Sequence, residues 1–333
     1  MSAYCVLDDD YTGDEHDASS DYTSVRILDT LPPVYEVLEP PLTEEEKERI
    51  KWLKEKLYER IDAKIADIED PASYLEQKVS ALLKSSDALE TIMYYIKRDM
   101  IGYGKLDVIL NDKNVEDVSV DGPHIPVYVY HNSYGSLMTN VSFGKEELDS
   151  MVYRLSQQAG KHISLANPLL DASLPSGDRL QMTIGDEVTT RGSTITIRRF
   201  RRVPMNPIDL INYDTFSVEM MTYLWMAVEN GSNILVAGGT ASGKTSVLNA
   251  IAMFIPQGSK IVSIEDTREI NLTYDNWIPA VTREVEEGGH SIDMFHLLKE
   301  ALRQRPEYIL VGEVRGREAY TLFQAMATGH ITY

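Results

Sequence analysis

A glycine-rich octapeptide, placed between a short apolar run and an apolar helical pattern, constrains the fold of this chain more than any other feature. The apolar run covers residues 233–237, and apolar residues at helical spacing resume at Val247. Between them stands Gly238-Gly239-Thr240-Ala241-Ser242-Gly243-Lys244-Thr245. A strand, then G-x-x-x-x-G-K-[ST], then a helix is the arrangement of a P-loop, in which backbone N–H groups and the helix start bind phosphate. The sequence therefore predicts an α/β fold with a phosphate site.

The chemistry of this loop assigns roles to its last residues. The ammonium group of Lys244 is expected to reach the β- and γ-phosphates, and the hydroxyl group of Thr245 is expected to bind Mg²⁺. The predicted nucleotide contacts comprise the loop and the residue after it: Gly238, Gly239, Thr240, Ala241, Ser242, Gly243, Lys244, Thr245 and Ser246. A turn that only connects two elements does not need lysine and threonine at these positions. The motif alone does not distinguish an ATPase from a kinase or a GTPase.

Two further apolar runs end in carboxylates. Residues 261–264 precede Glu265 and Asp266, and residues 308–312 precede Glu313. Since ligands bind at the carboxyl ends of strands in doubly wound sheets, we expect both sets to converge on the P-loop. A P-loop NTPase needs such groups to hold the Mg²⁺ shell and to orient an attacking water. Acidic residues also commonly follow strands in solvated turns without any catalytic role. This alternative explains both sites together less well than it explains either site alone.

The overall charge limits the classes of partner. With 52 acidic and 32 basic residues the formal net charge is −20. This excess argues against a nucleic-acid-binding protein, because neutralising phosphates requires clustered Lys and Arg. No run approaches the roughly 18 apolar residues of a membrane span, and the single cysteine, Cys5, cannot form an internal disulfide. We expect a cytoplasmic protein without direct membrane insertion.

Changes in composition and periodicity divide the chain into five segments. These are an acidic, mobile tail with a proline-rich connector (1–41), a helical region (42–101), a small α/β domain (102–202), a linker (203–215) and the P-loop domain (216–333). Thr43 and Glu46 form a capping box at the start of the helical region. Period-two patterns predict strands of the small α/β domain at 115–120, 127–130, 179–184 and 193–200, with a turn at 132–135 and a helix over 145–159.

Five further short segments carry specific motifs. They read Ile264-Glu265-Asp266-Thr267-Arg268-Glu269, Val311-Gly312-Glu313-Val314-Arg315, Thr328-Gly329-His330, Pro175-Ser176-Gly177-Asp178-Arg179-Leu180 and Thr196-Ile197-Arg198-Arg199-Phe200. Together with the P-loop, this combination resembles the secretion-superfamily ATPases of type II and type IV secretion, specifically the archaeal branch that drives the archaellum, type IV pili and type II-like secretion. The likeness runs from about residue 100 to the end of the chain.

The resemblance implies a fold and a set of catalytic residues. The implied fold is a RecA-like P-loop NTPase core preceded by a small α/β domain, assembled as a ring of six with ATP and Mg²⁺ between the two domains. Beside Lys244, either Glu265 or Asp266 is implied to activate water. Glu313 is implied to lie near Mg²⁺, and His330 opens the catalytic histidine box.

Three arginines of the first domain are also implied to take part. By resemblance Arg179, Arg198 and Arg199 clamp the γ-phosphate, since a guanidinium group matches phosphate geometry. Arg198 and Arg199 alternate faces on a predicted strand, so we expect only one of the two to reach the nucleotide. A solvated strand end is the alternative explanation for each of them.

The sequence departs from the family pattern at its end. The family continues past Gly-His with a second histidine and a further helical region, whereas this chain stops at Tyr333. We therefore expect a RecA-like core that is incomplete at its C-terminus. For the same reason, the 333-residue stretch alone is expected to hydrolyse ATP weakly.

The leading hypothesis is a hexameric motor ATPase. It hydrolyses ATP to power assembly of a type IV filament, either a pilus or an archaellum, or type II-like protein secretion. It acts on a polytopic membrane platform protein, which holds it at the inner face of the cell membrane. The alternatives are the ring ATPase of a conjugative type IV secretion system and a nucleotide-sensing P-loop module without turnover. A P-loop kinase is disfavoured because no acceptor site is readable.

Overall fold

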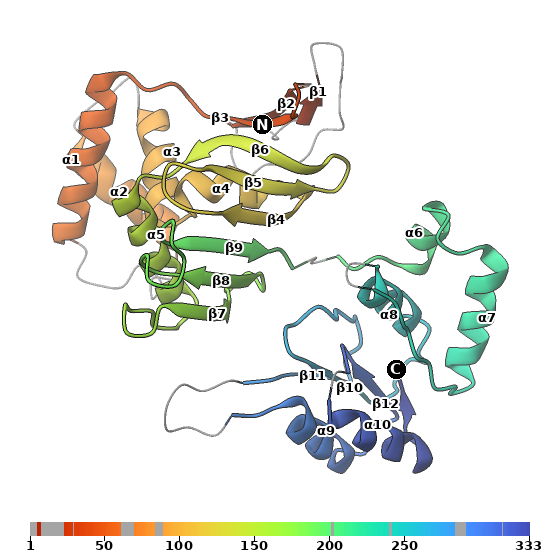
Figure 1. Ribbon diagram of the computed structural model, residues 1–333. Helices are drawn as coiled ribbons and strands as arrows, with labels where there is room; N and C mark the ends of the chain where they lie inside the picture. Colours follow the sequence, from red (N-terminus) through yellow and green to blue (C-terminus); the bar gives the residue numbers. More distant parts are fainter. Residues whose placement is uncertain are drawn as a thin grey trace. The chain divides into compact units, whose positions relative to one another are not determined.

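The computed structural model of the chain describes residues 5–7, 23–28, 30–60, 70–83, 89–200, 203–239, 242–283, 291–314 and 316–333. The chain forms two compact units, Met1–Arg199 and Phe200–Tyr333 (Figure 1). Among the helices within these described ranges, none combines the length and the apolar character that crossing a bilayer requires.

The first unit is built on a nine-stranded sheet. In chain order its elements are β1 (Cys5–Leu7), β2 (Ser24–Leu28), β3 (Val34–Leu38), α1 (Glu44–Arg60), α2 (Pro71–Leu82), α3 (Leu89–Met100), a 3₁₀ turn (Gly104–Leu106), α4 (Asp107–Asn111), β4 (Val115–Val120), β5 (Pro126–His131), β6 (Gly135–Ser142), α5 (Lys145–Gln158), β7 (Leu169–Ser173), β8 (Arg179–Thr183) and β9 (Thr194–Arg198). The strand order is β1-β2-β3-β6-β5-β4-β9-β8-β7. The predicted strands and the helix over 145–159 are confirmed, whereas β6 and β7 were not predicted.

Alternation along the strands makes this sheet one-sided. Apolar residues of the central strands, such as Val118 and Ile197, are fully buried in a core that includes residues of α4 and α5. The intervening residues, such as Tyr128 and Tyr130 of β5, are exposed on the opposite face. A polar and aromatic face of the sheet is thus left uncovered by helices of this unit, as a strict period of two requires.

The prediction of a mobile tail and connector over residues 1–41 is wrong for three stretches, the first of which is β1, paired parallel with β2. Residues 24–28 and 34–38 form β2 and β3, which pair antiparallel, and β3 continues the sheet beside β6. Val25, Ile27 and Tyr35 are buried there, and the Tyr35 hydroxyl donates to the buried Asp112 at 2.8 Å. The short alternating pattern of these strands was hidden by averaging with the acidic stretch around residues 8–21, which lies outside the described residues.

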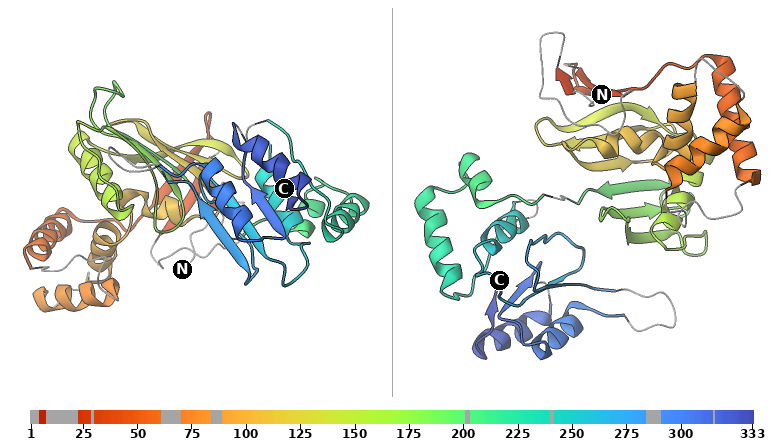
Figure 2. Two further views of the ribbon diagram at one scale, coloured as in Figure 1. Left: turned by 90° about the horizontal axis from the view of Figure 1, so that it is seen from below. Right: turned by 180° about the vertical axis from the view of Figure 1, so that it is seen from behind.

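The predicted helical region is confirmed in its described part. Helices α1, α2 and α3 share a core of their own and lie at one end of the first unit's sheet (Figures 1 and 2). The capping box is formed: the Thr43 N–H donates to the Glu46 carboxylate at 2.8 Å, and the Glu46 N–H donates to the Thr43 hydroxyl at 3.3 Å. Arg98 of α3 donates to both carboxylate oxygens of Glu39, which follows β3. This ion pair joins the helices to the sheet.

The second unit is a three-layer α/β structure. In chain order its elements are α6 (Pro207–Asn212), α7 (Val218–Glu229), α8 (Lys244–Ala252), β10 (Ile261–Glu265), β11 (Trp277–Val281), α9 (Met294–Arg303), β12 (Tyr308–Val311), α10 (Glu318–Ala327) and β13 (Ile331–Thr332). The strands are all parallel, in the order β11-β10-β12-β13. The predicted α/β fold class is therefore confirmed.

The two faces of this parallel sheet bury different helices. Ile261 and Leu310 pack in a core with α8, and Ile264 and Val311 pack in a second core with α9 and α10. Figure 2 shows α8 on one side of the strands and α9 and α10 on the other. All five residues of β10 are buried, as expected for a central parallel strand covered on both faces.

The predicted linker over residues 203–215 is wrong in its middle. Residues 207–212 form α6, whose first turn is capped by the Asn206 side chain accepting from the Ile208 N–H at 2.8 Å. Leu210 is buried with Met221 and Ala250. Prolines were interpreted as interruptions of the pattern, but Pro207 stands at the first helical position, where its missing N–H costs nothing.

Residues 233–237 do not form the buried strand expected before the P-loop. One backbone hydrogen bond ties this segment to β13, from the Ile234 N–H to the Thr332 carbonyl at 3.1 Å. Leu235 is 76% exposed. The segment lies at the β13 edge of the sheet, so neighbouring strands do not cover it on both sides as they cover β10.

Replacing Tyr35 by alanine should destabilise the protein. The change removes a fully buried ring and leaves the Asp112 carboxylate without its hydroxyl donor, so we expect a loss of about 3–5 kcal/mol. The measurement is urea unfolding followed by circular dichroism. Tyr58→Ala is the matched control, because this tyrosine is 67% exposed and its loss should change stability by less than about 0.5 kcal/mol. Equal stability of the two variants would restore the mobile-tail interpretation.

Candidate functional site

The P-loop leads directly into α8. Gly243 adopts a left-handed conformation with φ 85°, which lets the chain turn into the helix at Lys244. Gly238 is required by close approach, since a Cβ at this position would lie 2.6 Å from the Ser242 hydroxyl oxygen. Two of the predicted contacts, Thr240 and Ala241, lie outside the described residues.

The ammonium group of Lys244 contacts its own loop. Its Nζ atom donates to the carbonyl oxygen of Gly239 at 2.6 Å, and the Ser242 hydroxyl donates to the same oxygen at 2.8 Å. No carboxylate within the described part of the chain forms an ion pair with Lys244. Thr245 and Ser246 follow in the first turn of α8, where both are half-buried.

Glu265 is buried at the carboxyl end of β10. Its side-chain Oε1 atom accepts the N–H groups of Glu269 at 2.8 Å and of Ile270 at 2.7 Å. The other oxygen, Oε2, is buried and has no hydrogen-bond partner among the described residues. Burial raises the pKa of Glu265 to about 7, against the opposing effect of the two N–H donors. The carboxylate therefore fixes the loop that follows its own strand.

Asn249 links this loop to the P-loop helix. It is a buried residue of α8, and its side-chain amide donates to the Glu269 carbonyl at 3.1 Å and accepts from the Asn271 N–H at 2.9 Å. Asn249 was not predicted as a site residue from the sequence. The signal available was one polar residue inside an apolar helical pattern, which is typical of a buried side chain with backbone partners.

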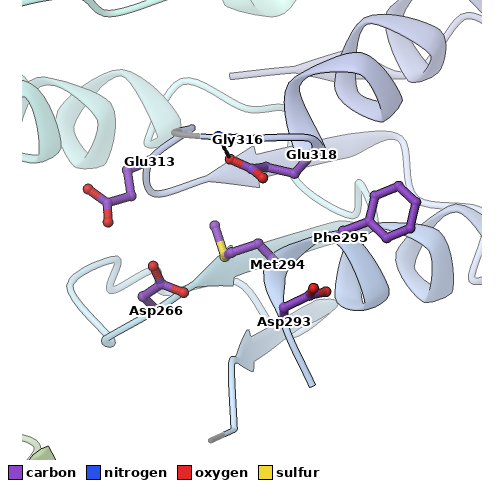
Figure 3. A pocket seen from close by; sticks show the side chains of 7 residues that line it. All are labelled: Asp266, Asp293, Met294, Phe295, Glu313, Gly316 and Glu318. Atoms are coloured by element: carbon purple, nitrogen blue, oxygen red, sulfur yellow. Dashed lines mark hydrogen bonds between the residues drawn. The ribbon is translucent and has the colours of Figure 1, made fainter. Parts of the chain in front are cut away.

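Two of the predicted carboxylates line one cavity. Asp266 follows β10 and Glu313 follows β12, and both face a cavity of about 270 Å³ (Figure 3). Asp293, Met294, Phe295, Gly316 and Glu318 complete its lining. No described residue of the P-loop belongs to this lining, so the structure joins Asp266 to Glu313 but does not bring Lys244 to them.

The ends of two helices frame the same cavity. Asp293 caps α9 by accepting the His296 N–H at 2.9 Å, and it also pairs with Arg317. The His296 N–H, followed by Arg317, lowers the pKa of Asp293 to about 2. Glu318 begins α10 and accepts the N–H of Gly316. Asp293 and Glu318 therefore both accept backbone N–H groups, at the starts of α9 and α10 respectively.

Gly312 brings β12 close to the buried carboxylate. A Cβ at Gly312 would lie 3.1 Å from Cγ of Glu265, a tighter contact than side chains normally make. The Gly312 N–H also extends the strand pairing by donating to the Ile264 carbonyl at 2.9 Å. The absence of a side chain at Gly312 therefore leaves room for the Glu265 side chain. The spacing of the motif did not indicate this role for the glycine.

The catalytic role predicted for His330 is inconsistent with the strand register. His330 precedes β13, and Ile331 pairs with Tyr308, the first residue of β12. Because the strands are parallel, His330 lies at their amino ends, whereas Glu313 lies beyond their carboxyl ends. At about 3.3 Å per residue, the two edges are roughly 15–20 Å apart. The His330 ring instead contacts the Thr328 hydroxyl at 3.2 Å.

The three arginines belong to the first unit and have different surroundings. Arg179 and Arg198 are register partners on β8 and β9, and both side chains are exposed. Arg179 pairs with Asp171 at 2.7 Å, and Arg198 pairs with Asp117 at 3.1 Å.

Arg199 directly follows β9 and is less exposed than Arg198. Its guanidinium group donates to the Asp112 and Val115 carbonyls. Its Nε atom is buried and has no partner in the described part of the chain. Arg198 and Arg199 thus have different surroundings, and Arg199 is held by the backbone of its own unit.

The Glu265→Gln substitution should make stability less dependent on pH. Between pH 4.5, the ordinary pKa, and about 7 the folded protein binds more protons than the unfolded chain. The stability of the wild type therefore falls as pH rises through this window, and glutamine removes that loss. We expect the variant to gain about 2–3 kcal/mol relative to the wild type between pH 5 and pH 8. Urea unfolding at both pH values measures it, and a pH-independent difference would contradict the raised pKa.

Curated relatives of this chain include archaeal and bacterial proteins. Uncharacterized protein MJ0900 of Methanocaldococcus jannaschii is 43% identical over 242 residues, which cover 72% of this chain and 44% of that protein. Type IV secretion system protein VirB11 of Bartonella henselae is 27% identical, with 68% of this chain and 72% of that protein covered. Probable conjugal transfer protein TrbB of Sinorhizobium fredii is 28% identical, with 68% of each covered. The chain thus spans less than half the length of MJ0900.

Solved structures with similarity include an ATPase of a secretion system and a pilus motor. The VirB11 ATPase of the Brucella suis type IV secretion system, in complex with sulphate, shows 26% identity and a TM-score of 0.31, covering 67% of this chain and 72% of that one. The pilus retraction motor PilT with bound ADP shows 20% identity and a TM-score of 0.45, covering 66% and 62%.

A family profile matches most of the chain. The family is described as Type II/IV secretion system protein, and the match runs from residue 114 to residue 333. It includes the whole second unit, with the P-loop and the parallel sheet of the predicted RecA-like core. The chain belongs to the type II/IV secretion system protein family.

Proposed function

We propose that the protein is a motor ATPase that powers assembly of a type IV filament, a pilus or an archaellum, or type II-like secretion. The observation that carries this proposal is the connection between the P-loop and the acidic loop. Asn249 lies on the helix that begins with Lys244, and it holds the backbone on both sides of Ile270, whose N–H binds Glu265. Phosphate-binding and acidic segments are thereby fixed to each other.

The proposed reaction gives each group a task. Water attacks the γ-phosphorus of ATP, the bond to the bridging oxygen breaks, and ADP and phosphate leave while a proton passes to a carboxylate or to solvent. Lys244 holds the β- and γ-phosphates. Asp266 and Glu313 orient the water, because they face the cavity, whereas Glu265 positions the loop after β10, to which Asp266 belongs. His330 is left out of this set.

Besides ATP, Mg²⁺ is proposed as the second ligand of the site. Thr245 and Glu313 offer the hydroxyl and carboxylate oxygens that this hard cation prefers. No group of three or more potential metal ligands occurs among the residues with described positions. That finding suits Mg²⁺, which is bound by one or two protein groups together with substrate phosphates. When bound, it would neutralise charge on the transferred phosphoryl group.

The working assembly is also a proposal. We infer a ring of six subunits that lies at the inner face of the cell membrane and acts on a polytopic platform protein. Arg198 and Arg179 are the candidates for contact with phosphate, because their side chains are exposed, whereas Arg199 donates to carbonyl groups. The family assignment and the named secretion relatives support this assembly.

A conjugative ring ATPase is the second candidate. The relatives named VirB11 and TrbB favour it, since the second is named for conjugal transfer. Genes for filament subunits and a polytopic platform beside this gene would support the first proposal. Genes for a mating channel would support the second.

Replacing Lys244 by alanine should abolish ATP hydrolysis while the fold survives. The ammonium group is the only positive side chain of the loop, and we expect phosphate release to fall at least about 100-fold. Lys244 bonds only to Gly239 among the described residues, so urea unfolding should change by less than about 1 kcal/mol.

Lys260→Ala is the matched control for this experiment. Its ammonium group also donates to a backbone carbonyl, that of Gln304, at 2.6 Å, but it lies outside the site. Unchanged phosphate release in Lys244→Ala would defeat the motor proposal. Tight ATP binding without release in the wild type would favour the nucleotide-sensing module instead.

A further inference from the structure

Helix α7 is apolar on sides that its own unit leaves uncovered. Of its twelve residues only Glu219, Thr222 and Glu229 are polar. One side packs against α8 and the sheet, where Met221 and Val228 are buried. The large apolar residues that remain exposed on the helix are Val218, Met220, Tyr223, Trp225 and Met226. A helix that is apolar all round is normally buried all round, so the exposed side of α7 has the composition of a covered surface.

Helix α9 of the same unit shows the ordinary pattern. Its exposed residues are His296, Lys299, Glu300 and Arg303, all of them polar. Single exposed apolar residues need no explanation, whereas contiguous apolar surface marks a place of interaction. Figures 1 and 2 show α7 at the margin of the second unit, outside α8. The apolar side of α7 is therefore an interaction surface rather than ordinary solvated surface.

This side of α7 contains a hollow of about 440 Å³. Phe216, Glu219, Met220, Tyr223 and Leu224 line it. Met220 precedes Tyr223 by three residues and Leu224 by four, so the three side chains lie along one side of the helix. An apolar hollow along a helix suits a second, amphipathic helix, whose apolar residues recur at the same intervals.

The charge around the hollow is of one sign. From residue 203 to residue 243 the sequence contains no Lys, Arg or His. The acids of this stretch are Asp209, Asp214, Glu219 and Glu229. We propose that the exposed side of α7 binds an amphipathic helix of a partner protein, with apolar residues that enter the hollow and Lys or Arg on both flanks.

The same acids disfavour two other occupants. A second copy that met this surface with its own would bring the acids of both copies together, because a two-fold contact pairs a patch with itself. A bilayer with anionic headgroups would be repelled for the same reason. A helix flanked by lysine or arginine meets opposite charge instead, with Glu219 at the rim of the hollow as its first partner.

A dye-labelled synthetic helix tests the proposal. The probe has about 18 residues, with leucine along one face and lysine on both flanks of that face, and a twin probe carries glutamate in place of lysine. Fluorescence anisotropy measures binding to the protein at physiological salt. The lysine probe should bind at least about tenfold more tightly than the glutamate probe. Because the net charge of −20 attracts lysine to the whole chain, single substitutions must locate the site.

Tyr223→Ser should weaken binding of the lysine probe about tenfold, since it removes an aromatic anchor of the hollow. Tyr320→Ser is the matched control and should leave binding unchanged. Tyr223 and Tyr320 are 72% and 71% exposed, both on helices of the second unit, so neither change should disturb the fold. Glu219→Gln should weaken binding about threefold, whereas Glu300→Gln, an equal change of net charge on α9, should not.

Three results would overturn the inference. The first is equal binding of the two probes, or equal weakening by Tyr223→Ser and Tyr320→Ser. The second is binding of the protein to vesicles of phosphatidylcholine and phosphatidylserine that Tyr223→Ser abolishes, which would assign the surface to a membrane. The third is self-association in analytical ultracentrifugation that Tyr223→Ser abolishes, which would assign the surface to a second copy. None of these readouts involves ATP, so the inference stands or falls independently of the proposed function.

Discussion

The second unit depends on a single buried carboxylate at the end of its central strand. Glu265 accepts two backbone N–H groups with one oxygen, and this fixes the path of the loop after β10. Asn249 then ties that loop to α8, and the missing Cβ of Gly312 lets the next strand close over the carboxylate. A charged group in this position is costly because water is excluded, which is why its pKa rises to about 7. The desolvated carboxylate stands where the loop after β10 is held against α8, the helix that follows the P-loop.

The carboxylates of this edge divide into two kinds. Glu265 is buried and acts on the backbone, whereas Asp266 and Glu313 line a cavity. Lys244 meets none of them in this structure, because it binds the Gly239 carbonyl. In the proposed function a triphosphate and Mg²⁺ would supply the link, since they carry the charges that both sets complement.

Local pattern was enough for much of the fold and for part of the site. The P-loop and the strands before Glu265 and Glu313 were recognised because their signals lie within a few consecutive residues. The strands β2 and β3 were missed because their two-residue alternation is short and stands beside an acidic stretch. Helix α6 was missed because prolines mark both chain breaks and helix starts. Asn249 is a single polar residue in an otherwise apolar helical stripe. That pattern indicates a buried side chain, but it does not indicate the hydrogen-bond partners.

By itself, the sequence determined which chemical groups stand at the ends of strands and at the start of the P-loop helix, because spacing along the chain settles these. Tertiary structure alone decided at which edge of the sheet each group lies. The parallel register of β12 and β13 carries His330 to the edge opposite Glu313. Just after β9, Arg199 donates to backbone carbonyls, while Arg198 at the end of the strand stays exposed. The physical reason is that register and burial depend on residues distant in sequence, and periodicity within one segment contains no record of them.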